Sequence, residues 1–393
     1  MKRKWLALLL FPALFCMPGQ APRLQAQPGQ ASPPAKTPPP SGAVATRRLS
    51  HLRHGINLSS WFAQVFDPKG YTQEHFLTHT TLEDIALIHA MGFDHVRLSI
   101  NPQPMFREGE ADAIPKGYLA HLDEAVNDIL ANGLAVILDI HPESDFKRRL
   151  ASDDFVERFA YFWRAFASHY AALNPDLVFF EILNEPELQD RYRWAGIQTK
   201  LAAAIREGAP QHTIIAAGAR WSDNDDLLVL EPLPDANVIY DFHFYEPHLF
   251  THQGANWSAP FWHFEHGLAY PSTPESAERT AAEVPGAANR LYVIRYGLEQ
   301  WNSARVEAEI GQVAEWGRSH AVPVICDEFG VYRIYADPAS RLAWLADVRN
   351  ALERHGMGWT MWDYSGGFGV VSKMNGKAVP DEGTLRALGL KRP

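Results

Sequence analysis

Residues 135–183 contain one complete strand–helix–strand unit. It begins with the short run AVILDI (Ala135–Ile140), continues through the amphipathic segment FVERFAYFWRAFASHYAAL (Phe155–Leu173), and ends with VFFEIL (Val178–Leu183). The first and last runs are almost entirely apolar rather than alternating, which is typical of strands buried on both faces of a parallel sheet. The helical segment ends at Asn174-Pro175, because proline cannot continue a helix.

Six further β-rich runs repeat this alternation on either side of the unit. They are Gly55–Ser59, His95–Ile100, Thr213–Ala217, Val238–Phe244, Val324–Glu328 and Gly358–Asp363. Eight strands with intervening helices favour a single α/β barrel of the (β/α)8 (TIM) type over an open, doubly wound sheet. The segment after the first run, Asn57-Leu58-Ser59-Ser60-Trp61, lacks the Gly-rich phosphate turn that an open sheet usually carries there.

Two helix starts within this pattern carry capping signals. Thr80 and Glu83 have the spacing of a capping box, which predicts a helix that runs to Met91. Asp337-Pro338 places an N-cap residue before proline at the first helical position and predicts a helix to about His355.

The first fifty of the 393 residues differ in composition from the rest. Lys2-Arg3-Lys4 precede an apolar run, Trp5–Met17, that is shorter than the roughly 20 residues of a spanning helix. We therefore expect residues 1–26 to be a Sec-type signal peptide, with an uncleaved anchor as the alternative, and the protein to be secreted or periplasmic without integral membrane association. Residues 27–50, rich in Pro, Ala, Ser and Gly, are expected to be a disordered linker before one folded domain, residues 51–393.

Charge and composition limit the classes of partner. Lys and Arg number 36 against 46 Asp and Glu, for a net charge of −10, and no basic block is present, which argues against nucleic acid and anionic membranes. The chain also has 12 Trp, 13 Tyr and 21 Phe, many of them near predicted strand ends or in one long loop, so burial alone does not account for all of them. The acidic balance itself identifies no partner, and we expect a monomer.

Acidic residues follow the fourth and the seventh predicted strands. The fourth ends in EILNEP, with Glu185, and the seventh in VICDEFG, with Glu328. In a parallel barrel both ends face the same mouth, so the two carboxylates should meet there. One protonated and one ionised carboxyl group are what cleavage of a glycosidic bond requires, and a separation of about 5 Å would give retention through a covalent intermediate.

With these motifs in order, residues 51–370 resemble glycoside hydrolase family 5, whose members are retaining barrel glycosidases. The resemblance implies that Glu185 is the acid/base, that Glu328 is the nucleophile, and that the sugar or the glutamates are contacted by Arg97, His141, Asn184, His243, Tyr245 and Trp362. Asn184 would contact the sugar 2-hydroxyl, and Trp362 would offer an apolar face to the sugar ring.

Four of these residues also have a structural alternative. Arg97 would keep Glu328 ionised, or it would instead form a salt bridge with Asp139 across the barrel. His141 and His243 would donate to sugar hydroxyls or orient a glutamate, unless they are core histidines, and Trp362 has barrel packing as its alternative.

The loop after the sixth strand is the main departure from a minimal barrel. Between Tyr245 and the helix expected near Ser303 lies a segment of more than fifty residues that is rich in aromatic side chains. We expect this long insertion to form a wall of a binding cleft through Trp257 and Trp262, with a small packed subdomain as the equal alternative. Trp61 and Trp221, after the first and fifth strands, are weaker cleft candidates.

The histidines of this region suggest a metal site as a further alternative; they are His243, His248, His252, His263 and His266. Pro247 interrupts the run, and no known ligand spacing matches, so we expect no metal and no cofactor.

The sequence thus predicts a secreted retaining endo-β-1,4-glucanase that acts on a polysaccharide. A β-mannanase, a β-1,3-glucanase or an exo-acting β-glycosidase remain alternatives within the same chemistry, because motifs fix the reaction and not the sugar. A non-catalytic carbohydrate-binding barrel is the alternative from another class, although both glutamates are present.

Overall fold

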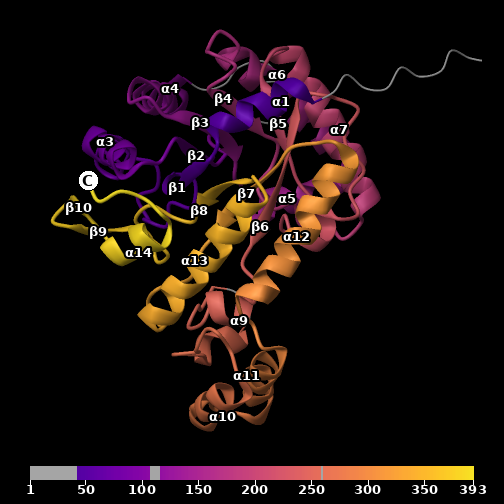
Figure 1. Cartoon of the computed structure of the whole chain (residues 1–393). Helices are drawn as coiled ribbons and strands as arrows, with labels where there is room; N and C mark the ends of the chain where they lie inside the picture. Colours follow the sequence, from indigo (N-terminus) through magenta and orange to yellow (C-terminus); the bar gives the residue numbers. More distant parts are fainter. Residues whose placement is uncertain (1–41, 107–115, 258–259) are drawn as a thin grey trace, which may run out of the picture. The chain divides into compact units, whose positions relative to one another are not determined.

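The computed structural model describes residues 42–106, 116–257 and 260–393. Eight parallel strands close into a barrel in the order of the chain (Figure 1). They are β1 (His54–Phe62), β2 (His95–Ile100), β3 (Ala135–Ile140), β4 (Val178–Glu181), β5 (Thr213–Ala216), β6 (Val238–Phe244), β7 (Val324–Phe329) and β8 (Gly358–Met361). The predicted (β/α)8 barrel is confirmed, and each predicted run is one of these strands.

Helices surround the barrel and cover the outer faces of its strands (Figure 1). The helices along the chain are α2 (Gln73–Thr78), α3 (Leu82–Met91), α4 (Lys116–Ala131), α5 (Ser144–Arg148), α6 (Asp153–Tyr170), α7 (Arg191–Gly208), α8 (Asn224–Leu227), α12 (Ser303–His320), α13 (Pro338–Arg354) and α14 (Glu382–Ala387), with the hairpin β9 (Val371–Met374) and β10 (Lys377–Pro380) before α14. In α6, for example, Phe155, Phe159 and Phe166 recur at helical spacing and are buried against the barrel.

The two capping predictions have different outcomes. Asp337 caps α13 as predicted, since its side chain accepts a hydrogen bond from the Ser340 backbone at 2.8 Å. The capping box predicted for Thr80 and Glu83 is wrong by one residue, because Thr81 and Asp84 form it at the start of α3. Asp84 is a shorter side chain than the expected Glu, yet it reaches back to the Thr81 backbone at 2.9 Å.

The barrel interior has an apolar layer below a layer of charged side chains. Ile137, Phe179, Ile239 and Ile325 form part of the lower cluster, and all are at most 1% exposed. Two positions further along the same strands lie Asp139, Glu181, Asp241 and Asp327, which are equally buried. Alternate residues of a barrel strand point inward, so each strand contributes to both layers. The charged layer forms the floor beneath the mouth of the barrel.

The predicted linker is too long at its C-terminal end. Residues 1–41 lie outside the described residues, as does the whole predicted signal peptide, but Ala43–Arg48 form helix α1, followed by the 3₁₀ turn Leu49–His51. Ala45 and Leu52 are fully buried against the lower apolar layer. The buried Arg48 donates to Asp176 at 2.7 Å and to the Gln211 carbonyl at 2.6 Å. These contacts order a segment whose composition alone indicates disorder.

The insertion after β6 has its own packed interior and also contributes to the wall of the cleft, which were the two alternatives from the sequence. It includes α9 (His248–Thr251), the 3₁₀ turn Pro260–Phe264, α10 (Pro274–Glu283) and α11 (Ala287–Glu299), and Figure 1 shows α10 and α11 together at the end of the barrel unit beyond α9. Phe250, Tyr270, Tyr296 and Trp301 are buried and give the insertion its own packed interior. Trp257, in contrast, is 55% exposed.

Candidate active site

A cleft of about 830 Å³ lies at the carboxyl ends of the barrel strands. Its walls come from the loops after several strands, and among the lining residues are Glu185, Glu328, His141, Asn184, His243, Tyr245 and Trp362. The motifs recognised in the sequence therefore meet at one place, as the parallel barrel requires.

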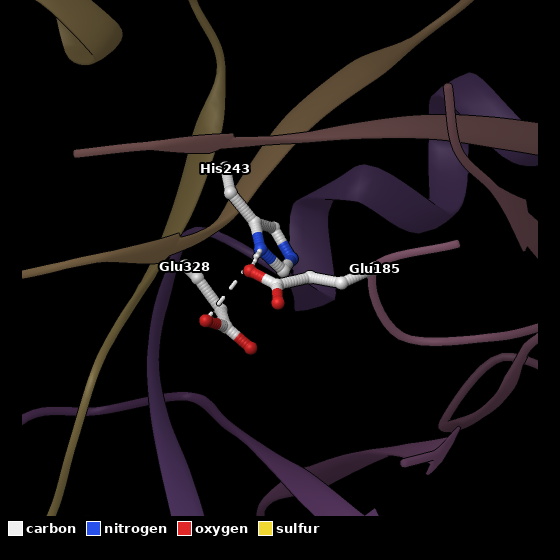
Figure 2. A group of neighbouring side chains, drawn as sticks. All are labelled: Glu185, His243 and Glu328. Carbon is white, nitrogen blue, oxygen red and sulfur yellow. Dashed lines mark hydrogen bonds and ion pairs between the residues drawn. The ribbon is translucent and has the colours of Figure 1, made fainter. Parts of the chain in front are cut away.

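Glu185 and Glu328 face each other across His243, as Figure 2 shows. One carboxylate oxygen of each glutamate and one imidazole nitrogen lie within 4.8 Å of one another. Nδ1 of His243 is 2.9 Å from Oε1 of Glu185 and 3.5 Å from Oε2 of Glu328. Glu185 has a φ of +44°, in the left-handed region, and such strain in a non-glycine residue often marks a functional site.

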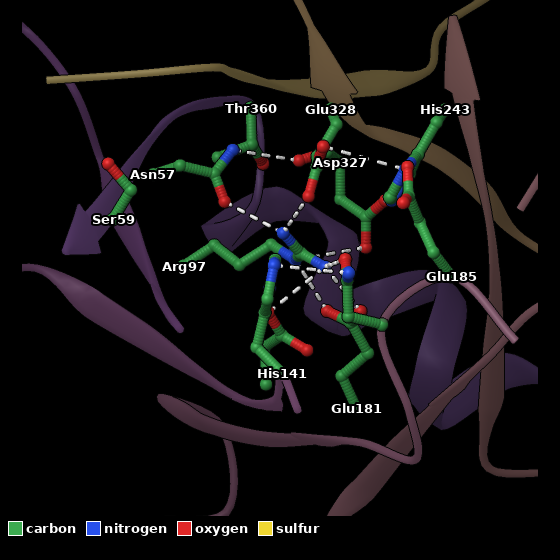
Figure 3. A network of polar contacts seen from close by, with 12 residues as sticks. Asn57, Ser59, Arg97, His141, Glu181, Glu185, His243, Asp327, Glu328 and Thr360 are labelled. Atoms are coloured by element: carbon green, nitrogen blue, oxygen red, sulfur yellow. Dashed lines mark hydrogen bonds and ion pairs between the residues drawn. The ribbon is translucent and has the colours of Figure 1, made fainter. Parts of the chain in front are cut away.

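Arg97 lies fully buried at the centre of the charged floor (Figure 3). It donates to Oε1 of Glu328 from Nη1 at 2.6 Å, and to both oxygens of Glu181 at 2.6 and 2.7 Å. Its Nη2 is also 3.1 Å from Asp139. The contact with Glu328 and the bridge to Asp139, which the sequence presented as alternatives, are both present.

The second oxygen of Glu328 is held from the other side. The Tyr245 hydroxyl donates to Oε2 of Glu328 at 2.9 Å. Burial, and then the charges of Glu328 and Glu185, raise the pKa of Tyr245 well above its ordinary value, so it remains a donor. Arg97 and Tyr245 together fix both oxygens of one carboxylate.

Asn184 and His141 continue this network toward the opposite wall. Oδ1 of Asn184 accepts from Arg97 at 2.8 Å, and its Nδ2 is 3.1 Å from Nε2 of His141. Nδ1 of His141 is 2.8 Å from Asp139, and its ring lies nearly parallel to Trp362, with 5.6 Å between the ring centroids. Both His141 and His243 line the cleft, so neither is an ordinary core histidine.

Glu185 and His243 have strongly perturbed pKa values. Burial would raise the pKa of Glu185, but the hydrogen bond and the positive charge of His243 lower it to about 2. Burial would lower the pKa of His243, but Glu328, Asp327 and Glu185 raise it well above its ordinary value. In the free protein the pair therefore holds its proton on the imidazole, although the sequence led us to expect it on a carboxyl group.

Aromatic side chains form much of the remaining cleft wall. Trp221 is 49% exposed and lines the cleft, as do Trp257 and Trp262. Trp257 makes an edge contact with Tyr332 at 4.8 Å, and Trp262 stacks on His248 at 5.7 Å with 11° between the rings. His248 and His252 are thus part of the wall, and His248 also lies 3.0 Å from Glu246.

Trp61 does not line the cleft, so that prediction is wrong. The strand β1 continues to Phe62, which directs Trp61 out of the barrel toward α2, where it is 5% exposed and donates to the Phe76 carbonyl at 3.0 Å. Three further aromatic residues that were not predicted also line the cleft, namely Phe66, Tyr332 and Phe368. Their position shortly after strands 1, 7 and 8 was the available signal.

Within the part of the chain that the structure describes, two groups of donor atoms have the spacing of a metal site. They are Glu185, His243 and Glu328, and beneath them Asp241, His243 and Asp327. Both groups use the imidazole of His243, which has carboxylates on either side. Protons shared between the imidazole and these carboxylates explain the short distances as well as a bound cation would.

The fold agrees with the comparisons with known proteins. Residues 61–367 match the cellulase family, glycosyl hydrolase family 5. Endoglucanase C of Acetivibrio thermocellus is 29% identical over 320 residues, which cover 80% of this chain and 91% of that protein.

Two solved structures extend this likeness to three dimensions. A hyperthermophilic endo-β-1,4-glucanase in complex with substrate has 25% identity and a TM-score of 0.72, over 88% of this chain and 99% of that one. Cel5A of Thermotoga maritima in complex with mannotriose has 25% identity and a TM-score of 0.70, with the same coverage. The family match excludes the alternative of a non-catalytic barrel, and the chain belongs to glycosyl hydrolase family 5, the cellulase family, as a glycoside hydrolase.

Proposed function

We propose that this hydrolase is a retaining endo-β-1,4-glucanase with Glu185 as acid/base and Glu328 as nucleophile. The observation that carries the proposal is the spacing of the two carboxylates, whose nearest oxygens lie within 4.8 Å. Retaining glycosidases have carboxyl groups about 5–5.5 Å apart, whereas inverting enzymes leave roughly 6.5–9.5 Å for a water molecule.

In the first step, Glu328 attacks the anomeric carbon while the bond to the leaving sugar breaks. Glu185 transfers a proton to the leaving oxygen, and a glycosyl ester of Glu328 forms. Arg97 and Tyr245 hold the attacking carboxylate in position, since each donates to a different oxygen of Glu328.

In the second step, Glu185 accepts a proton from water, which attacks the same carbon and releases Glu328. Two inversions give net retention. Between turnovers the proton rests on His243, 2.9 Å from Glu185. Substrate that covers the cleft removes water from Glu185, which raises its pKa and favours return of the proton to this carboxyl group.

The proposed mechanism predicts the anomer of the first product. Hydrolysis of a β-1,4-linked glucan followed by proton NMR should give the β-anomer first, with the α-anomer appearing only at the rate of mutarotation. An enzyme that releases the α-anomer first would be inverting, and Glu328 would then not be a covalent nucleophile.

The substrate is proposed to be a β-1,4-glucan, because the relatives include named endoglucanases. β-1,4-Mannan is the second candidate, since Thermotoga maritima Cel5A was solved with mannotriose. Comparison of kcat/KM on cellulose derivative, mixed-linkage glucan, xyloglucan and mannan decides between the two sugars and tests the β-1,4 preference.

Trp257 is proposed to stack on a sugar unit away from the bond that is cleaved. Trp257→Ala should lower kcat/KM on oligosaccharides about tenfold, mainly through KM, because stacking is worth roughly 0.5–1.5 kcal/mol beyond the buried area. Tyr192, which is 85% exposed and lies outside the cleft lining, provides the matched control Tyr192→Ala. Wild-type kinetics for Trp257→Ala would remove this residue from the substrate site.

We also propose that the protein is exported as a monomer. Among residues 42–106, 116–257 and 260–393, no helix has the length and apolar character needed to cross a bilayer. Export is supported by the basic and apolar start of the chain. N-terminal sequencing of the exported protein should begin at Gln27, and light scattering should give the mass of one chain.

A further inference from the structure

The charged floor contains two aspartates, Asp241 and Asp327, that the proposed mechanism does not use. Both are fully buried beneath His243, and the family resemblance assigns a role to neither of them. No oxygen of either side chain has a conventional hydrogen-bond partner among the described residues, and the same holds for Nε2 of His243. Buried polar atoms without partners are rare, so this group of five atoms requires an explanation.

A bulge in β7 lets Asp327 and Glu328, which are neighbours in the chain, both face the barrel interior. Phe242 pairs with Cys326 and His243 pairs with Glu328, so Asp327 is an extra residue in the ladder. In a regular strand neighbouring side chains point to opposite faces, but here both Asp327 and Glu328 contact Arg97 inside the barrel, at 3.6 and 2.6 Å.

His243 lies between two pairs of carboxyl groups. Its Nδ1 faces Glu185 and Glu328, at 2.9 and 3.5 Å, and its Nε2 faces Asp327 and Asp241, at 3.4 and 4.0 Å. Both ring nitrogens can donate only when both carry a proton. The arrangement therefore favours the imidazolium form, with one N–H directed upward to the site and one downward to the floor.

One shared proton accounts for the lower pair. Burial and the adjacent Asp327 raise the pKa of Asp241 well above its ordinary value. Burial acts in the same direction on Asp327, but Arg97 and His243 outweigh it and lower its pKa. One oxygen of Asp241 and one of Asp327 lie within 4.8 Å of each other. The opposite pKa directions assign the shared proton to Asp241 and leave Asp327 as the anion that faces Nε2 of His243.

We propose that Asp241 and Asp327 are positioning residues, a carboxylic acid and a carboxylate that share one proton and hold His243 doubly protonated, with its Nδ1–H directed at Glu185. This inference rests on the proposed acid/base role of Glu185. A divalent cation in place of the proton is disfavoured, because it would lie beside the guanidinium of Arg97, which already contacts Asp327 at 3.6 Å.

The test combines NMR of the His243 side chain with a pH profile. In the wild type, ¹⁵N NMR should show both ring nitrogens protonated at neutral pH, with the His243→Asn spectrum used for assignment. Several titratable or charged groups lie around the His243 ring and can affect its titration. They are Glu185, Glu328, Asp241, Asp327, Tyr245, Arg97 and Cys326. The NMR result does not depend on hydrolysis, so it stands even if the proposed function fails.

Asp327→Asn and Asp241→Asn should behave differently. Asp327→Asn removes the anion beneath Nε2, so the pKa of His243 should fall and the basic limb of kcat/KM should move down by about one to three pH units. Asp241→Asn replaces a neutral acid by a neutral amide that still donates to Asp327, so both readouts should remain near the wild type. If Asp327→Asn does not fold, Asp327→Ser provides the same test, because it also removes the anion beneath Nε2.

Glu265→Gln is the matched control, because Glu265 is also fully buried, with no hydrogen-bond partner for either oxygen among the described residues, yet lies outside the cleft lining. It should leave the His243 titration and the pH profile unchanged. A wild-type His243 with only one protonated nitrogen at neutral pH would overturn the proposal. So would equal shifts in the two aspartate variants, an unshifted Asp327→Asn, or one tightly bound divalent ion per chain.

Discussion

Replacement of Glu328 by Gln is expected to reduce kcat on a soluble β-1,4-glucan by a factor on the order of 10⁴ or more. An amide is too weak a nucleophile to form the glycosyl ester. The carbonyl oxygen of Gln can still accept from Tyr245 or Arg97, so the cleft should keep its shape. Calorimetry with a cello-oligosaccharide should therefore give a Kd close to that of the wild type, while rate assays show the loss.

A second variant separates the roles of the two glutamates. Glu185→Ala should be slow on natural glucan but form the glycosyl ester quickly from an activated aryl glycoside, whose leaving group needs no proton. Azide should then speed turnover and give a β-glycosyl azide. Glu265→Gln serves as the control for loss of a carboxylate, since Glu265 lies outside the cleft lining. If Glu328→Gln hydrolysed glucan at wild-type rates, the nucleophile would have to be another residue.

The sequence predicted the barrel and the main site because both depend on local patterns. Apolar runs such as Ala135–Ile140 identify buried strands, and a parallel barrel brings the ends of β4 and β7 to one mouth, so Glu185 and Glu328 had to meet. The contact of Arg97 with Glu328 follows from the same geometry.

Other features depend on a single residue of register, which sequence patterns do not resolve. Trp61 lies in the core because β1 extends to Phe62, whereas Trp221, beyond the end of β5, is exposed in the cleft. Alternation along β7 turns Asp327 inward with Ile325, and only the bulge reveals that the next residue, Glu328, faces the interior beside it. The ordering of Ala45 depends on contacts with strands that are distant in sequence.

Replacement of Arg97 by Met is expected to have the largest effect on stability. Arg97 is the guanidinium that four buried carboxylates share, namely Asp139, Glu181, Asp327 and Glu328. Removing one partner of a buried ion pair leaves charge uncompensated and costs roughly 3–5 kcal/mol. The free energy of unfolding at neutral pH should fall by this amount, and hydrolysis should be lost as well because Glu328 is no longer held.

Arg97→Lys is the matched variant that keeps the charge. A lysine ammonium cannot bind Glu181 with two parallel bonds and reach Glu328 at the same time, so activity should still fall, while stability should lie between those of the wild type and Arg97→Met. Equal stability of the Lys and Met variants would contradict a role for the charge itself.

The loss of unfolding free energy in Arg97→Met should depend on pH, and this dependence gives the sharpest test of the role of the charge. Arg97 is the leading cause that lowers the pKa of Asp327 against the effect of burial. A carboxyl group whose pKa is lowered in the folded state stabilises the fold at pH values above its pKa in the unfolded chain, which is about 3.9 for Asp. This contribution disappears as the pH falls through the folded-state pKa. The deficit measured by urea unfolding should therefore be largest near neutral pH and should shrink below about pH 4. A deficit that did not change with pH would instead indicate lost packing of the Arg97 side chain as its cause.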